Sequence, residues 1–479
     1  YVVHRNTLVT DETKVWTPSH FKRLLDSGFS SKKKAKNVKQ RVIIRNADGH
    51  TVGVPDDVDE RHQFALAEDF VFESLWQRAS TVSLSPGKEI SKISYVVDGV
   101  AAEREGLPRA EADSLLGYLK NLAGLNLDEK RKPQSGTITA ELGETTVDIV
   151  VQTGGSTAGE KLTLQILGAE TEYKIDDLGF TEEQLKTVRD VMHADKGFAV
   201  FSGPRGSGVT VTIYSLARSH DAFLNNIQTL ETDREYQLFN ITQHIFKPSD
   251  EKTFASEIQK IVRTDPDIII LPQPPDSGGA ELASQAAAKK QNLYTTLVAD
   301  DVLEALRKWI ELVNDPKLVA KSLSLIVNQR LVRRLCLDCK QAYKPDPQML
   351  RKANLPKDKV FHRQPEPEYD KHGNAIICQN CHGTGYVGRT GVFDVLAVDD
   401  GLRDVIRQGG STSEIRAYLT QRGGGGLQQQ ALIKVQDGTT SIQEVIRVTR
   451  SPSAKSRGAA PGKARPKTKR SGAATPSAR

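Results

Sequence analysis

The sequence predicts an α/β protein whose core is a parallel sheet that carries a phosphate-binding loop. An apolar run at residues 197–201 leads into the glycine-rich segment 202–212, and a helix can follow from Val211. A second apolar run, residues 268–271, lies beside an acid in a Walker-B-like pattern. The strand–loop–helix context separates this loop from the alternative, an ordinary glycine-rich turn beside an ordinary buried strand. We expect the two runs to be neighbouring inner strands, with Thr210 opening the helix.

Further elements and segments are predicted on both sides of this core sheet along the chain. A hairpin is predicted around the turn at residues 46–49, between two short runs that favour strands. Strands at 92–97 and 145–151 alternate with a helix at 110–123, as in a small α/β domain. The predicted segments are a polar leader (1–60) with a basic run at 32–36, an α/β domain (61–170), a P-loop domain (171–325), a tetracysteine lobe (326–398), a helical segment (399–450) and a basic tail (451–479).

The loop departs from the phosphate-binding pattern G-x-x-x-x-G-K-[ST] at one position, because Val209 stands where lysine is expected. The glycines of such a loop let backbone N–H groups face the phosphates. The lysine places a charge on the β- and γ-phosphates, and the hydroxyl reaches Mg²⁺. Valine preserves the shape of the loop and removes its charge. The predicted nucleotide-binding residues are Gly203, Pro204, Arg205, Gly206, Ser207, Gly208, Thr210 and Glu231.

Together with its neighbours, this region resembles the ATPases of type II secretion and type IV pilus assembly, the GspE/PilB type. The resemblance runs from about Glu73 to Thr449, and its most specific stretches are residues 264–270, 328–339 and 378–391. It implies a RecA-like P-loop core, ATP with Mg²⁺ as ligand, and inner-membrane secretion or pilus platform proteins as partners. It also implies a hexamer, either of this chain alone or mixed with an active paralogue, at a cytoplasmic site peripheral to the inner membrane.

The catalytic positions of that family are degenerate in this chain. Gln273 takes the place of the catalytic glutamate after the Walker B strand, and Val298 takes the place of a histidine. The acidic box that begins at Glu231 lacks its second acid, which is Thr232 here. The arginines that relatives aim at the γ-phosphate fall on Thr137 and Val150, and the Ala-Ser-Asp-x-His box is Ala79, Ser80, Thr81, Val82 and Ser83 here.

These losses predict a pseudo-ATPase. Losing a positioned acid or base costs roughly 10²–10⁴ in rate, and losing an arginine finger roughly 10³–10⁵. The losses do not add, because such residues act as a unit. The sequence therefore predicts a structural or regulatory subunit. Two alternatives stay open: a slow ATPase that uses Arg205 and Glu231 in place of the missing groups, and a nucleic-acid-binding zinc protein that works through its tail.

All four cysteines fall in two C-x-x-C knuckles, Cys336 with Cys339 and Cys378 with Cys381. Four thiolates in paired knuckles supply a closed tetrahedral site, which is the structural-zinc arrangement. The alternatives are two disulfides or four unrelated thiols, and disulfides need an oxidising compartment. The sequence therefore predicts zinc in this lobe.

Composition sets the remaining limits. A chain of 479 residues, 38% of them hydrophobic, suits about three domains, and no run approaches a membrane span. The net charge is +6, but the tail holds eight basic residues and no acid, so the rest is slightly acidic and predicts no specific nucleic-acid partner. The tail composition predicts disorder. The start at Tyr1 shows no signal-peptide pattern and, without methionine, indicates a truncated or processed beginning.

Overall fold

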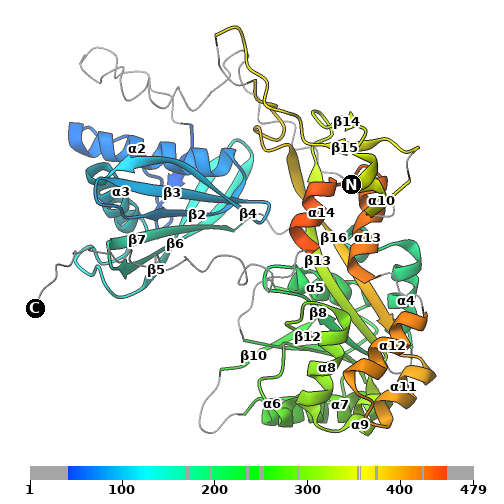
Figure 1. Ribbon diagram of the computed structural model, residues 1–479. Coiled ribbons are helices and arrows are strands. Elements are labelled where there is room, and N and C mark those ends of the chain that lie inside the picture. Colours follow the sequence, from blue (N-terminus) through cyan, green and yellow to red (C-terminus); the bar gives the residue numbers. More distant parts are fainter. Residues whose placement is uncertain are drawn as a thin grey trace, which may run out of the picture.

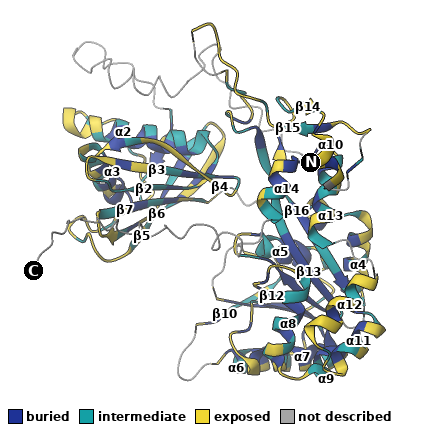
Figure 2. Ribbon diagram, viewed as in Figure 1, coloured by how far each residue is buried: buried dark blue, intermediate teal, exposed yellow. Residues whose placement is uncertain are grey.

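The computed structural model describes two seven-stranded sheets, each with its own helices (Figure 1). The predicted α/β fold class is confirmed. No helix among the residues described is both long and apolar enough to cross a bilayer. Figure 2 shows that the buried residues gather between each sheet and its helices. The structure describes residues 41–167, 173–194, 197–232, 237–247, 253–289, 291–352, 355–356, 358–372, 376–422 and 426–449.

The N-terminal sheet is antiparallel, with the order β1-β5-β6-β7-β2-β3-β4. Buried and exposed residues alternate along β6, so one face is covered and the other is open. Helices α2 and α3 contribute apolar side chains to the covered face, and Asp57 caps the first turn of α2. The elements are β1 (Ile43–Arg45), α2 (Val58–Trp76), β2 (Ala79–Ser85), β3 (Ile90–Val97), β4 (Val100–Pro108), α3 (Arg109–Leu122), β5 (Gln134–Leu142), β6 (Thr145–Ser156) and β7 (Gly159–Leu167).

The expected leader hairpin forms its turn, but β1 belongs to the sheet of the following domain. Arg45 bridges to Thr51 across the turn, while β1 pairs with β5. Val42 and Ile44 are fully buried, and burying these two apolar side chains stabilises β1 on the larger sheet. The expected domain boundary at residue 60 is therefore wrong, because it would separate β1 from the sheet to which it belongs. The basic run at 32–36 and the tail at 451–479 lie outside the described residues.

The second sheet carries the P-loop and has the order β10-β9-β11-β12-β8-β13-β16, with only β16 antiparallel to its neighbour. Residues of α4 and α5 pack on one face, and residues of α6, α7, α8 and α9 pack on the other. The elements are α4 (Glu182–Met192), β8 (Phe198–Ser202), α5 (Val209–Ser219), β9 (Ile227–Glu231), β10 (Thr242–Ile245), α6 (Phe254–Arg263), β11 (Ile268–Leu271), α7 (Ser277–Lys289), β12 (Asn292–Leu297), α8 (Val302–Val313), α9 (Pro316–Ser322), β13 (Leu325–Leu335) and β16 (Tyr386–Ala397).

Two details of the prediction for this sheet are wrong. Strands β8 and β11 are both inner strands, but β12 lies between them and pairs with each. Leu293 and Tyr294 of β12 are fully buried, so both faces of this strand are covered. The helix after the loop opens at Val209, one residue before Thr210, because Gly208 already takes the left-handed backbone that ends the loop.

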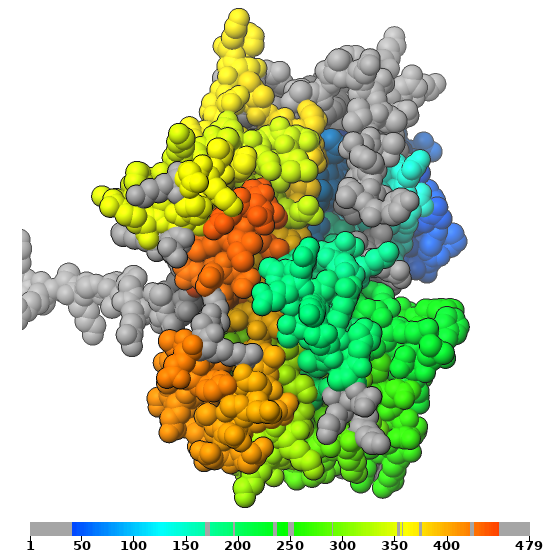
Figure 3. Space-filling model, turned by 90° about the vertical axis from the view of Figure 1, so that its right-hand side faces the viewer, coloured from blue at the N-terminus to red at the C-terminus, as the bar shows by residue number. Residues whose placement is uncertain are grey.

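The cysteine lobe is smaller than expected, because its flanking strands belong to the P-loop sheet. β13 pairs with β8, and β16 pairs with β13, so the lobe proper begins at Cys336 and ends before Tyr386. Figure 3 shows α13 and α14, in orange to red, between this yellow lobe and the green α4. The last elements are β14 (Gln341–Tyr343), α10 (Pro347–Lys352), β15 (Phe361–Arg363), α11 (Asp400–Arg407), α12 (Thr412–Arg422), α13 (Gly426–Gln436) and α14 (Ile442–Thr449).

Candidate functional site

The loop between β8 and α5 keeps the shape of a phosphate-binding loop. Gly206 and Gly208 have φ values of 78° and 84°, a conformation that residues with a Cβ rarely adopt. At Gly203 a Cβ would lie 2.3 Å from the Ser207 hydroxyl oxygen, so glycine is required there too. The Gly203 N–H donates to the Leu297 carbonyl at 3.2 Å and fixes the loop against the end of β12.

Gln329 of β13 hydrogen-bonds to the loop, a role that the sequence did not reveal. Its side-chain amide donates to the Ser207 carbonyl at 2.8 Å, and the residue is only 1% exposed. Its neighbour Asn328 donates to the Ser202 hydroxyl at 3.0 Å and to the Ala299 carbonyl at 3.1 Å. These two amides tie the carboxyl ends of β8 and β12 and the loop to the middle of β13. The only signal for them was their place in the stretch 328–339.

The lysine position offers no charge. Val209 is the first residue of α5, and Arg205 is exposed in the loop. Two other cations near this edge of the sheet already have acceptors. Lys308 donates to the Val298 carbonyl at 2.9 Å and pairs with Glu304, while Arg330 binds the Asp300 carbonyl and carboxylate.

The structure brings together the two degenerate positions that follow β11 and β12. The side-chain amide oxygen of Gln273 accepts from the Val298 N–H at 3.0 Å, and both residues are exposed. Lys308 binds the carbonyl of the same Val298, so a continuous hydrogen-bonded segment runs from the end of β11 to α8. An amide at Gln273 accepts this bond as a carboxylate would, but it cannot take a proton from water at neutral pH.

Glu231, at the end of β9, is only 8% exposed, and its side chain is hydrogen-bonded within the protein. Its carboxylate accepts from the Tyr214 hydroxyl, from the Thr229 hydroxyl and, at 2.9 Å, from the Gln243 amide. A carboxylate held by three donors is a structural acceptor rather than a free base. The rest of the acidic box, Asp233 and Glu235, lies outside the described residues.

The degenerate positions of the N-terminal domain form one row across its sheet. Thr137 pairs with Val150, Val150 pairs with Gln165, and Gln165 pairs with Thr81. Residues directly opposite each other on neighbouring strands point to the same face, and here it is the uncovered one. The two arginine positions and the acid position that the resemblance assigned are therefore adjacent, and all three carry uncharged side chains.

Acidic residues also gather at the carboxyl edge of the P-loop sheet. Asp394 of β16 lies opposite Asn328, and Asp301 caps α8. Burial, with a smaller contribution from Asp301, raises the pKa of Asp394 to about 6.

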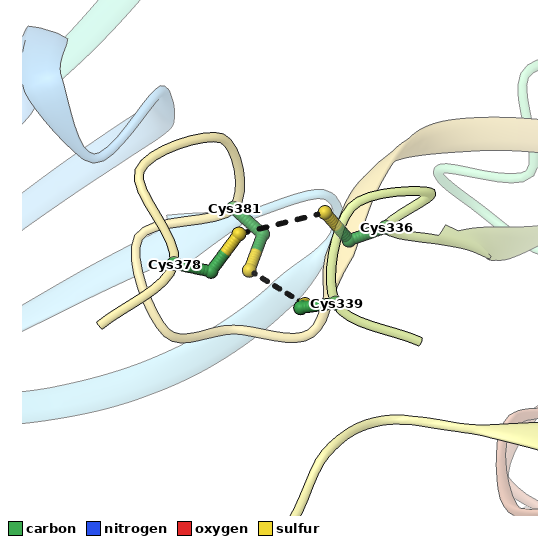
Figure 4. A group of neighbouring side chains, drawn as sticks. All are labelled: Cys336, Cys339, Cys378 and Cys381. Carbon is green, nitrogen blue, oxygen red and sulfur yellow. Dashed lines mark hydrogen bonds between the residues drawn. The ribbon is translucent and has the colours of Figure 1, made fainter. Parts of the chain in front are cut away.

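The four cysteines converge as a metal site should (Figure 4). All four sulfur atoms lie within 4.8 Å of one another, with Cys336 3.8 Å from Cys378 and Cys339 3.6 Å from Cys381. Four sulfurs at about 2.3 Å from a zinc ion are about 3.8 Å apart in a tetrahedron. Burial raises the pKa of the Cys336 and Cys339 thiols, and a bound cation would reverse that effect.

This fold and this loop define the class of protein. The family model described as type II/IV secretion system protein matches residues 57–447, which is most of the chain. The protein belongs to that family. The most specific stretches of the resemblance, including both cysteine knuckles, lie within the matched region.

Individual relatives agree with the family. The type IV pilus assembly ATPase PilB of Thermus thermophilus is 30% identical, over 82% of this chain and 43% of that protein. The type II secretion system protein E of Pseudomonas aeruginosa is 30% identical, over 84% of this chain and 78% of that one. The chain thus spans less than half of the first relative and over three quarters of the second. The solved ATPase DotB of Legionella pneumophila matches 82% of this chain and 97% of its own with a TM-score of 0.56 and 15% identity, which supports the fold alone.

Proposed function

We propose that this chain is a non-hydrolysing homologue of the secretion and pilus-assembly ATPases. It acts as a structural or regulatory subunit of a type II secretion or type IV pilus-like machine. Val209 is the observation that carries the proposal. It stands at the first position of α5, where a lysine would bring positive charge to the β- and γ-phosphates, and its side chain is apolar.

The charges at the loop edge support the same proposal. A charge-assisted hydrogen bond contributes about 1.5–3 kcal/mol, so loss of the lysine weakens phosphate binding by about ten- to a hundredfold. Lys308 and Arg330 are bound to protein acceptors, and their charge is already partly neutralised.

Zinc is the ion that we assign to the cysteine cluster. The sulfur separations fit a tetrahedral ion, and the closed set of four thiolates leaves no position for a substrate. Cys336, Cys339, Cys378 and Cys381 would hold it. Its contribution when bound is structural, because it joins the loop that follows β13 to the loop that precedes β16.

The partners and location belong to the same proposal. The subunit would lie on the cytoplasmic face of the inner membrane, against platform proteins of the machine, without a specific nucleic acid. It would form a hexamer of its own or enter one with an active paralogue. Co-expression with such a paralogue, followed by light scattering, should give a mixed ring, and separate particles would argue against the mixed assembly.

Calorimetry with Mg-ATP tests the proposal. The unmodified chain should bind at least about ten times more weakly than Val209→Lys, given the lost charge-assisted bond. Equal affinity of the two proteins would contradict the account of the loop. Thr210→Ala serves as the control, because it removes the Mg²⁺-directed hydroxyl and leaves the charge at position 209 unchanged.

A slow ATPase remains the second candidate, favoured by the exposure of Arg205 in the loop. Glu231 already accepts hydrogen bonds from three donors, which argues against its use in place of the missing acid. Measurable ATP turnover by the unmodified chain would favour this second candidate. The double change Val209→Lys with Gln273→Glu should not restore normal turnover, because Thr137 and Val150 still supply no positive charge. Full activity in the double variant would show that the N-terminal row is dispensable.

A further inference from the structure

The second cysteine knuckle contacts the N-terminal domain directly. The Trp76 ring at the end of α2 stacks on the His382 ring, with centroids 4.3 Å apart and planes 10° from parallel. The Arg78 guanidinium donates to the Tyr386 carbonyl at 3.2 Å. The Gly388 N–H donates to the Asp98 carboxylate at 3.1 Å. Figure 4 shows strands of the N-terminal domain, in faint blue, passing beside the cysteines.

The backbone at this contact is unusual on both sides. Six non-glycine residues in the described part of the chain have positive φ, and three of them are Arg78, Asp98 and His382. For Asp98 the conformation is ordinary, because an Asp-Gly pair suits the tight turn between β3 and β4. Arg78 and His382 have no such turn chemistry. Unfavourable backbone conformations persist where the surroundings fix them, and they cluster at functional contacts.

The conformation of His382 depends on the knuckle itself. Its N–H donates to the Cys378 carbonyl at 2.9 Å, and the Gly385 N–H approaches the Cys381 sulfur at 3.3 Å. A bound ion would hold these cysteines from the inside, while the same turn presents His382 and the Tyr386 carbonyl to the N-terminal domain. The contact therefore rests on a turn that the metal stabilises.

We propose that the N-terminal domain docks on the second cysteine knuckle, and that metal occupancy sets the position of that domain relative to the P-loop sheet. The inference rests on the metal assignment made above and not on the loss of ATP hydrolysis. The domain that it positions carries the row of Thr81, Thr137 and Val150. Loss of the ion would thus free the domain whose uncovered face, in relatives, the resemblance directs at nucleotide.

The test uses the full, zinc-loaded chain under reducing conditions. Small-angle scattering gives the radius of gyration, and limited proteolysis with a glutamate-specific protease gives the rate of cleavage. Removing zinc with a chelator should increase the radius and raise the cleavage rate by about tenfold, which corresponds to 1.4 kcal/mol. Trp76→Ala should do the same with one zinc per chain still bound.

Arg78→Gly separates docking from folding. Glycine adopts the left-handed backbone without penalty, so the N-terminal domain should keep its thermal stability while the bond to the Tyr386 carbonyl is lost. Docking predicts a larger radius for this variant. Asn314→Gly is the matched control, since Asn314 also has positive φ but ends α8, in the other domain. Its radius should stay unchanged.

Two results would overturn the proposal in different ways. Zinc loss with an unchanged radius and cleavage rate would refute the docking role and leave the metal assignment standing. Purified protein without zinc would refute the metal assignment and, with it, the dependence on occupancy. An unchanged radius in both Trp76→Ala and Arg78→Gly would refute the contact itself.

Discussion

Glu444 of α14 fastens the C-terminal helix to the strand that leads into the cysteine lobe. Its side chain is fully buried and pairs with Arg333 at 2.8 Å and Arg447 at 2.5 Å. It also accepts from the Arg333 backbone N–H at 3.0 Å. Burial alone would raise the pKa of this carboxyl, but the hydrogen bonds from Arg447 and Arg333 outweigh it and lower the pKa to about 2.

The contribution of Glu444 to the folding free energy follows from this pKa shift. The ordinary pKa is 4.5, and a fall of about 2.5 units corresponds to about 3 kcal/mol of folding free energy. Because the folded pKa is the lower one, the contribution is complete above pH 4.5 and is lost as the pH falls toward 2. Glu444→Gln should therefore cost about 2–3 kcal/mol at pH 7 and roughly half of that at pH 3.

Urea unfolding followed by circular dichroism at both pH values measures the effect. Glu311→Gln is the control, because Glu311 forms an exposed pair with Arg307 one helical turn away, and such pairs contribute about 0.5 kcal/mol or less. A cost for Glu444→Gln that equals the control, or one that does not change between pH 7 and pH 3, would refute the reasoning.

Three further predictions concern the loop edge and the metal. Burial and Asp301 raise the folded pKa of Asp394 to about 6, so this carboxyl costs stability as the pH rises through 6. Asp394→Asn should stabilise the protein by about 2 kcal/mol at pH 8 and by little at pH 4, measured by urea unfolding. Gln329→Leu removes the donor to the Ser207 carbonyl and should cost about 1–3 kcal/mol, and a neutral effect would contradict its role in holding the loop. Cys339→Ser should lower the zinc content from one ion per chain to near zero, measured by elemental analysis, and full retention would contradict the four-thiolate site.

The sequence predicted elements whose signal is local. The apolar runs at β8 and β11 and the glycines between β8 and α5 depend on residues that are neighbours in the chain, and both were found. The position of β12 between the two strands was missed, because strand order is set by pairing between distant segments. The same reason explains β13, whose apolar start belongs to the P-loop sheet rather than to the lobe.

The candidate site was predictable to a similar extent. The four cysteines carry their spacing in the sequence, and Val209 stands at a position that a motif defines. Gln329 and Lys308 follow no such pattern, because a buried amide and a helix lysine gain their roles only from the backbone groups they meet. The contact of Trp76 with His382 joins residues about 300 positions apart, and nothing local marks it.

Steady-state hydrolysis of Mg-ATP by the full zinc-loaded chain tests the central claim most directly. We predict that the unmodified chain and Thr210→Ala release phosphate at the same rate, which equals that of buffer alone. Hydrolysis by the unmodified chain that Thr210→Ala abolishes would contradict the claim, because it would show that the loop positions Mg-ATP for reaction without its lysine.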